Sequence, residues 1–229
     1  MKRAFPIFAV LTALLLSYAL YEALVAAPTE KTMGDVQRIF YYHVPSAWTA
    51  FLLFLINFVA SVVYLIRRSH SADIVAVVTA EVGVVFCTVV LVTGPLWARP
   101  VWGIWWTWDV RLTSTLVLWL IYVSYLMLRR FSTSSQTPLL AAALAVFGAL
   151  DVPLVYFSIW IFRTQHPQPV IGGGGSIDPR MLHILLLNWV AFLCFAALIC
   201  WSRYRLERLR REVEETQALE SLLEPRSLR

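Results

Sequence analysis

Residues 74–97 read IVAVVTAEVGVVFCTVVLVTGPLW, an apolar stretch in which Glu81 is the one charged side chain. A helix needs about 20 predominantly apolar residues to cross the hydrocarbon core of a bilayer, so this stretch predicts a membrane span. Five further apolar stretches lie before and after it, at residues 5–27, 46–66, 113–128, 139–162 and 182–202. The stretch at 113–128 is short, and we expect its helix to extend back into the tryptophan-rich segment that precedes it. The sequence therefore predicts an all-α fold, a polytopic membrane protein with six transmembrane helices.

The overall composition agrees with a membrane protein. Of the 229 residues, 59% are hydrophobic and 14% are charged, and the mean hydropathy is +0.70, whereas a soluble domain carries about 25% charged residues. The net charge of +5 comes from short basic clusters between the apolar stretches. This arrangement indicates membrane topology and argues against nucleic acid as a partner. The three cysteines lie inside apolar stretches and form no Cys-x-x-Cys pair, so a cysteine metal site is not expected.

The first apolar stretch shares features with a secretory signal. Lys2 and Arg3 give it a basic start, and Val25-Ala26-Ala27 resembles a cleavage site. A signal core is about 7–15 residues long, and this stretch is longer, which favours a retained helix.

Basic residues are distributed unequally between the two sides of the predicted protein. Because the connections between six spans alternate, eleven basic residues fall on one side, namely Lys2, Arg3, Arg67, Arg68, Arg129, Arg130, Arg203, Arg205, Arg208, Arg210 and Arg211. Six fall on the other side, namely Lys31, Arg38, Arg99, Arg111, Arg163 and Arg180. Cytoplasmic loops carry an excess of Lys and Arg, so the first side and both termini are predicted to be cytoplasmic. We expect residues 1–202 to form the transmembrane domain and residues 203–229 a charged, helical cytoplasmic tail.

Three polar features of the chain have more than one interpretation. Glu81 and Asp151 lie inside predicted spans, where carboxylates are costly in lipid; they either line a polar cavity or pair locally, and both interpretations stay open. The glycine run at 172–175 has no following Lys-Ser/Thr pair, so it predicts a flexible outer loop instead of a phosphate-binding loop.

The predicted topology brings histidines from distant segments to the outer face. His43 ends the first outer connection, His166 lies in the third, and His183 is near the start of the last span, whereas His70 falls in a cytoplasmic loop. Two neutral imidazoles that approach from opposite sides are what axial ligation of a haem iron requires. Loop histidines are usually plain surface groups, so their placement alone is a weak signal.

The tryptophan-rich segment is the main candidate for a binding surface. Residues 97–113 read WARPVWGIWWTWDVRLT and hold five of the ten tryptophans, more than an aromatic belt at the headgroup level needs. One broad indole face is predicted by the helical spacing of Trp102, Trp105, Trp106 and Asp109. A porphyrin could stack on this face, and Arg99 and Arg111 could bind its propionates. Covering about 200 Å² of porphyrin contributes roughly 5 kcal/mol, and association costs about 4–15 kcal/mol. Stacking alone would hold haem poorly, so axial ligands are also required.

These motifs resemble a known family. Residues 102–113, WGIWWTWDVRLT, resemble the WWD signature of haem-handling proteins, and within that group the family of cytochrome c maturation protein C, also called haem exporter protein C. The stretches VTGP at 92–95 and RIFYYHVPSAW at 38–48 are similar to the same family. The binding candidates that follow are His43, His166, Trp102, Trp105, Trp106, Trp108, Asp109, Arg99 and Arg111.

The resemblance also implies a ligand set and a role. Two outer-face histidines ligate the iron of haem b in that family; His43 matches the first directly, and His166 matches the second, because it follows a helix with an Asp-Val-Pro step and an aromatic end. His183 matches no family ligand and is expected to be a helix-end histidine. The implied role is non-catalytic: haem is bound at the periplasmic face of a bacterial inner membrane and presented to a periplasmic haem chaperone. The implied partners are ATP-binding-cassette transporter subunits and a small one-helix subunit, with lipid around the spans.

Two other classes of haem protein are alternatives. Cytochrome c synthase-type haem lyases share a tryptophan-rich signature, but they resemble larger proteins whose signature tends to continue with Pro-Lys-Glu, whereas this chain continues with Val110-Arg111-Leu112. Electron-transfer haem b membrane subunits place their histidine ligands inside helices at mid-membrane depth, whereas His43 and His166 are expected in loops. Both differences favour haem delivery.

Overall fold

The computed structural model describes residues 3–162, 164, 166–167 and 177–223. Its elements are the helices α1 (Ala4–Tyr21), α2 (Phe40–Arg67), α3 (His70–Trp102), α4 (Val110–Phe131), α5 (Thr137–Ala149), α6 (Asp151–Ile161) and α7 (Pro179–Leu223), with a π-helical turn η1 (Glu22–Ala26) and a 3-10 turn η2 (Asp35–Ile39). Pairing of extended backbone in the described residues is limited to one isolated bridge, Glu30–Gly34. The predicted all-α fold class is confirmed.

Within the described residues, six helical segments are long and apolar enough to cross a membrane, which confirms the polytopic prediction. They are Ala4–Ala26, Asp35–Arg67, His70–Trp102, Val110–Phe131, Thr137–Ile161 and Pro179–Ser221. The fifth was expected as one continuous helix but breaks at Leu150, between α5 and α6. Pro153 lacks the N–H that would bond to the carbonyl of Ala149, which explains the break.

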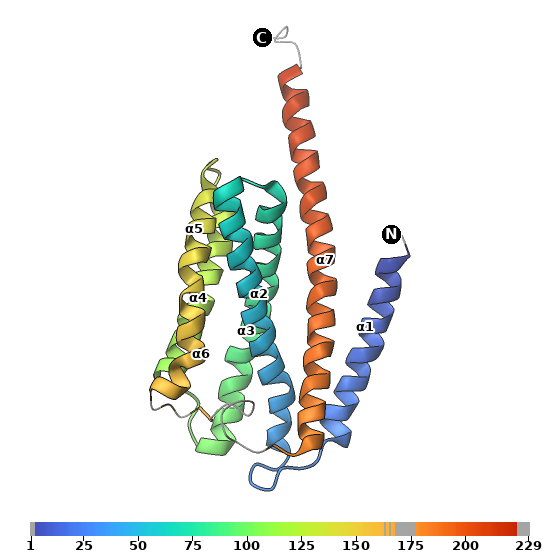
Figure 1. The fold of residues 1–229 in the computed structure, drawn as a ribbon, viewed down its shortest axis with the longest axis vertical. Coiled ribbons are helices and arrows are strands. Elements are labelled where there is room, and N and C mark those ends of the chain that lie inside the picture. Colours follow the sequence, from blue (N-terminus) through green and yellow to red (C-terminus); the bar gives the residue numbers. More distant parts are fainter. Residues whose placement is uncertain (1–2, 163, 165, 168–176, 224–229) are drawn as a thin grey trace.

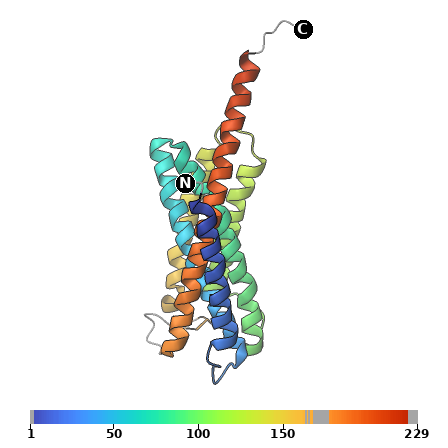
Figure 2. The ribbon, with the colours of Figure 1, turned by 90° about the vertical axis from the view of Figure 1, so that its right-hand side faces the viewer.

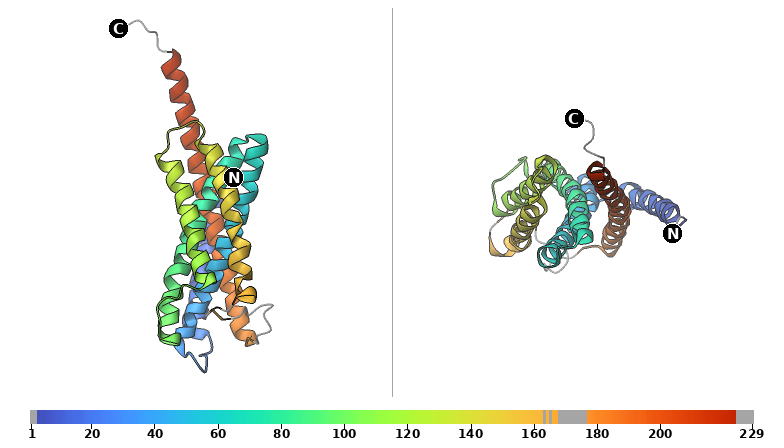
Figure 3. Two further views of the ribbon diagram at one scale, coloured as in Figure 1. Left: turned by 90° about the vertical axis from the view of Figure 1, so that its left-hand side faces the viewer. Right: turned by 90° about the horizontal axis from the view of Figure 1, so that it is seen from above.

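The helices stand side by side in an elongated row (Figure 1; Figure 3, view from above). Helix α2 packs against α3, α5 and α7, while α4 packs against α3, α5 and α6. Helix α1 stands at the end of the row and packs on α7, as the side view in Figure 2 shows. Its outer surface carries exposed apolar side chains such as Val10 and Leu14, as expected for a helix that faces lipid.

The connections alternate between the two ends of the row, as the predicted topology requires. The turns η1 and η2, the tryptophan-rich connection 103–109 and the C-terminal end of α6 lie at one end, here named the outer end (Figure 1). The short connections 68–69 and 132–136 lie at the other end, on the side to which both termini point (Figure 1). The predicted glycine loop at 172–175 lies outside the described residues.

The tryptophan-rich connection is not part of a helix, which corrects the prediction that the fourth span extends through it. Helix α3 ends at Gly103, whose φ of 76° is in the left-handed region that glycine adopts at helix ends. Helix α4 begins at Val110, after Asp109 accepts a hydrogen bond from the N–H of Leu112 as the N-cap. Between these two signals the backbone is irregular, so the expected helical face of Trp102, Trp105 and Asp109 does not form.

The second and third spans also begin earlier than the apolar stretches indicate. Helix α2 starts at Phe40, so His43, expected in a connection, lies in the first turn of a helix. His70, expected in a loop, is the first residue of α3, after the N-cap Ser69. The first turns of α2 and α3 contain aromatic or polar side chains outside the apolar stretches, so hydropathy alone does not mark where these helices begin.

The seam between α2 and α3 forms the centre of the core. Phe54 of α2 is fully buried and stacks on Tyr122 of α4, with the ring centroids 3.8 Å apart. Gly83 of α3 lies against the Phe54 ring, so closely that a Cβ there would come within 2.7 Å of it. Nearby, the side-chain amide of Asn57 donates to the carbonyl of Ala76 at 2.6 Å. These contacts fix the register of the two helices that carry much of the site.

Ion pairs join the helices at the end opposite the outer end. Arg129 of α4 binds Asp73 of α3 through two hydrogen bonds of 2.8 and 2.6 Å, and Arg211 of α7 lies 2.8 Å from the same carboxylate. Glu81 pairs with Arg203 in the same way, at 2.9 and 2.8 Å. The structure therefore favours local pairing for Glu81, one of the two interpretations left open. For Asp151, one carboxylate oxygen is buried without a partner among the described residues.

Candidate functional site

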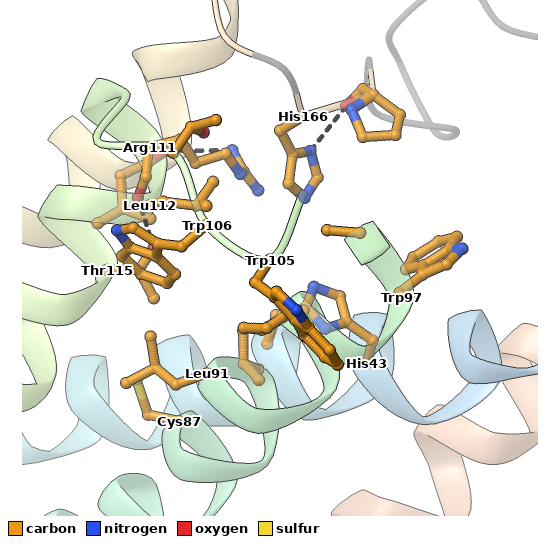
Figure 4. A pocket seen from close by; sticks show the side chains of 18 of the residues that line it. His43, Cys87, Leu91, Trp97, Trp105, Trp106, Arg111, Leu112, Thr115 and His166 are labelled. Atoms are coloured by element: carbon orange, nitrogen blue, oxygen red, sulfur yellow. Dashed lines mark hydrogen bonds between the residues drawn. The ribbon is translucent and has the colours of Figure 1, made fainter. Parts of the chain in front are cut away.

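A cavity opens at the outer end, between α2, α3, α4 and the residues that follow α6. Its empty volume is about 960 Å³, part of which is open to solvent. The lining is mostly apolar, with Phe51, Cys87 and Val155 among the residues of its floor and walls. Figure 4 shows His43, His166, Trp105 and Arg111 around this space.

His43 reaches the cavity from the first turn of α2. The residue is 7% exposed, and its ring packs edge-on against Trp97 with the centroids 5.8 Å apart. Its Nδ1 lies 2.8 Å from the hydroxyl oxygen of Thr93 in α3. The ring is thereby held by two residues of the neighbouring helix.

His166 reaches the same cavity from the irregular segment after α6. Its Nδ1 lies 2.9 Å from the carbonyl oxygen of Pro167. Because a carbonyl can only accept, Nδ1 carries the hydrogen and Nε2 keeps its lone pair. Burial, together with the positive charge of Arg111, lowers the pKa of His166 to about 4. The imidazole is therefore neutral at pH 7, the form that ligates a metal.

The two histidine rings face each other at a distance that suits a shared iron. Their centroids are 6.4 Å apart and their planes are inclined by 34°. Figure 4 shows one nitrogen of His166 bonded to the Pro167 carbonyl and the other directed toward His43. Two imidazoles that bind one iron from opposite faces have centroids roughly 6 Å apart, because each metal–nitrogen bond is about 2 Å long and each nitrogen lies about 1 Å from its ring centroid.

The tryptophans of the irregular connection contribute unequally to the cavity. Trp102, Trp105 and Trp106 line it. Trp108 does not; it is 76% exposed and touches Trp106 edge-on, with the ring centroids 5.7 Å apart. Trp102 at the end of α3 and Trp105 and Trp106 of the connection therefore form an inner surface of three indoles, and Trp108 is displayed on the outer surface.

The charged candidates also differ in position. Arg111 lines the cavity and donates to the carbonyl of Val155 in α6 at 3.1 Å. Arg99 donates to the carbonyl of Gly103 and lies over the Trp105 ring, 5.9 Å from its centroid, and is not part of the lining. Asp109 also lies outside the lining, where it caps α4 and accepts a hydrogen bond from Thr107 at 3.0 Å. Arg99 and Asp109 thus shape the connection that carries the indoles.

Some residues of the cavity were not assigned from the sequence. Trp97 belongs to the tryptophan-rich segment but is not among the predicted binding residues, and Thr93 and Gly94 belong to the family-like stretch VTGP. Of these three residues, Trp97 and Gly94 line the cavity. The spacing of Thr93, Gly94 and Trp97 along one face of a helix is the signal that could have found them. His183 is exposed and does not line the cavity. His70 is the first residue of α3, at the end opposite the outer end.

The donor set fits haem better than a bare metal ion. Among the described residues, no group of three or more His, Cys, Asp or Glu side chains could hold an ion, whereas a porphyrin itself supplies four ligands and needs only two more from the protein. The indole N–H groups of Trp97 and Trp106 are buried without a partner in the described part of the chain. With Arg111, they are donors that suit the carboxylates of porphyrin side chains.

Comparison with known proteins identifies the family of the chain. The family model for heme exporter protein C matches residues 1–219. Heme exporter protein C of Bradyrhizobium diazoefficiens is 35% identical over 222 residues, which are 96% of this chain and 84% of the relative. A putative cytochrome c biosynthesis ccmC-like mitochondrial protein of Arabidopsis thaliana is 33% identical over 220 residues, covering 93% and 84%. Heme exporter protein C of Escherichia coli K12 is 33% identical over 180 residues, covering 78% and 73%. The chain therefore belongs to the heme exporter protein C family, whose members handle haem in cytochrome c biogenesis.

Proposed function

We propose that this protein binds haem b between His43 and His166 at the periplasmic face of a bacterial inner membrane and presents it to a periplasmic haem chaperone. The observation that carries the proposal is the pair of facing imidazoles. Their ring centroids are 6.4 Å apart, although the two residues are more than a hundred positions apart in the chain. Haem would supply the iron and the flat apolar surface. The chain supplies two neutral ligands, an indole wall and donors for the propionates.

The two ligands are held with different rigidity, which suits a carrier that must release its cargo. His43 belongs to a helix and is packed against Trp97 and Thr93. His166 belongs to an irregular segment, where its hydrogen bond is to the adjacent residue Pro167. Segments outside regular helices open at lower cost than helices in a core. We therefore assign the first step of release to loss of the His166 bond while His43 still holds the iron.

The surface next to the cavity offers a place for the receiving protein. Trp105 is 55% exposed and Trp108 is 76% exposed, although both are large apolar side chains. Contiguous exposed aromatic surface marks protein interaction sites. A chaperone docked on Trp108 would lie beside the open side of the cavity, where it could bind the iron through its own ligand as His166 withdraws. ATP-binding-cassette subunits and a one-helix subunit would contact the apolar outer faces of the spans.

The depth of the site separates this proposal from an electron-transfer haem subunit. His43 lies in the first turn of α2, and His166 lies outside the helices, so the pair is at the outer end of the row and not at its middle. Ligands near the surface favour exchange with a soluble partner over electron transfer within the bilayer.

Haem recovery from the purified full-length protein tests the proposal. We expect His43→Ala and His166→Ala to lower the haem measured by a pyridine haemochrome assay, whereas His70→Ala, at the opposite end, should retain it. A tagged periplasmic haem chaperone should co-purify only when haem synthesis is active. Full haem recovery in both cavity variants would reject the ligand assignment, and equal chaperone recovery with and without haem would reject haem-dependent delivery.

A further inference from the structure

The side chain of Thr93 occupies a position that the proposed function leaves unexplained. Thr93 lies in α3, in the stretch VTGP at 92–95, and its hydroxyl oxygen is 2.8 Å from Nδ1 of His43 in α2. The two residues are fifty positions apart in the chain and meet because α2 and α3 pack together along their length. A single polar contact of this kind, beside a candidate metal ligand, decides which ring nitrogen can bind.

The direction of the hydrogen bonds at Thr93 follows from counting its hydrogen. A hydroxyl carries one hydrogen and two lone pairs. Thr93 donates its hydrogen to the carbonyl of Val89, one turn earlier in α3, at 2.7 Å. Toward His43 the hydroxyl must therefore act as acceptor, and the Nδ1 of His43 must be the donor.

We infer that Thr93 is a positioning residue that holds His43 in the tautomer with hydrogen on Nδ1, so that the Nε2 lone pair is presented to the iron. This inference rests on the proposed function, in which His43 is a haem ligand. It gives both histidines the same arrangement, because the Pro167 carbonyl holds Nδ1–H of His166 in the same way. A hydrogen bond at the distal nitrogen also raises the basicity of the ligating one.

The neighbours of Thr93 complete the seat for the His43 ring. A Cβ on Gly94 would lie 3.5 Å from Cε1 of His43, an ordinary van der Waals contact, so the backbone of α3 at Gly94 lies beside the edge of the ring. Pro95 has no N–H and therefore leaves the carbonyl of Leu91 without its usual helical partner. The Thr-Gly-Pro sequence thus combines an acceptor for the ring, a backbone that lies beside the ring and a local weakening of the helix.

The tautomer can be read directly in the haem-free protein. With ¹⁵N-labelled histidine, the two ring nitrogens of each of the four histidines give separate shifts for protonated and unprotonated nitrogen. We expect the signal that disappears in His43→Ala to show a protonated Nδ1 in wild type and in Thr93→Ser, and a mixture of tautomers in Thr93→Val. A wild-type His43 protonated on Nε2 would overturn the inference, whatever the variants do.

The haem-bound protein supplies the second measurement. We expect Thr93→Val to weaken haem binding by about 10- to 100-fold and to raise the haem midpoint potential, and Thr93→Ser to restore both. Thr79→Val is the matched control. Thr79 lies in the same helix but away from the cavity, and its hydroxyl donates to the carbonyl four residues earlier, that of Val75, at 2.8 Å, as Thr93 donates to Val89.

The outcomes separate this inference from the proposed function. If His43→Ala loses haem but Thr93→Val behaves like Thr79→Val in affinity and potential, Thr93 does not position the ligand, and the haem site stands. If His43→Ala keeps its haem with an unchanged spectrum, the ligand assignment itself fails.

Discussion

Replacement of Gly83 by valine tests the seam on which the site depends. Helix α3 passes α2 so closely at Gly83 that a Cβ would lie 2.7 Å from Cε1 and 3.0 Å from Cδ1 of Phe54. Phe54 has no free space to move into, because it is fully buried and stacked on Tyr122 with the ring centroids 3.8 Å apart. The added side chain must push the helices apart or force the ring from its stack.

The magnitude follows from two opposing effects. Overpacking of a core costs about 1–3 kcal/mol, and three added carbons next to a confined ring place Gly83→Val at the upper part of that range. Removal of a glycine from a helix returns a few tenths of a kcal/mol when valine replaces it. We therefore expect a net loss of about 2 kcal/mol in the free energy of unfolding.

Unfolding of the purified protein in mixed detergent, followed by circular dichroism, measures this loss. Val85→Leu is the matched control, since Val85 is in the same helix and 61% exposed, and it should change the stability little. Phe54→Leu combined with Gly83→Val should recover part of the loss, with a coupling of about 1 kcal/mol. A Gly83→Val protein as stable as wild type, with no coupling to position 54, would refute the close approach of α2 and α3.

Three further predictions concern the charges, the indoles and the pH dependence. Arg211→Ala should lower stability, because Asp73 loses one of its two arginine partners. Asp73→Asn should lower it further, because Arg129 then loses its carboxylate and Arg211 keeps only Glu207; thermal unfolding that ranks the variants in the opposite order would contradict this. Trp105→Ala should reduce bound haem, whereas Trp108→Ala should keep haem and weaken capture of the chaperone, as measured by co-purification; haem loss in the Trp108 variant alone would reverse the assignment. Since the pKa of His166 is lowered to about 4, the unfolded chain binds more protons than the folded one between about pH 6.5 and 4, so this group makes stability fall as pH is lowered through that window. Haem retention should nevertheless change little from pH 7.5 to 5, because the folded imidazole stays neutral, and a loss centred near pH 6.5 would show that His166 is an ordinary exposed histidine.

The membrane architecture was predictable because hydropathy is a property of local sequence. Each of the six apolar stretches corresponds to a helix that can cross a membrane. The errors occur where backbone hydrogen bonding decides. Gly103 ends α3 and Asp109 caps α4. Both residues are helix-boundary signals that the sequence contains, but the helical spacing of the tryptophans predicts a continuous helix instead. The break before α6 likewise follows from Pro153.

The site was predictable only in part. His43, His166 and three of the indoles were found through a family resemblance, and the structure places them around one cavity. Trp97 and Val155 reach that cavity, and Thr93 reaches His43, because α2, α3, α4 and α6 pack in a particular register. A contact between residues so far apart in the chain leaves no trace in local composition, so Val155 could not be assigned without the packed structure, whereas Thr93 and Trp97 are signalled by their spacing along one helix face.

Electron paramagnetic resonance of the ferric haem protein tests the central claim, that His43 and His166 bind one iron. Wild type should give a six-coordinate, low-spin signal from two imidazoles. His43→Gly and His166→Gly should each give a high-spin signal, and added free imidazole should restore the low-spin form in both, because each substitution leaves a space of the right size beside the iron. A low-spin signal that survives unchanged in either variant would show that another group binds the iron and would contradict the account.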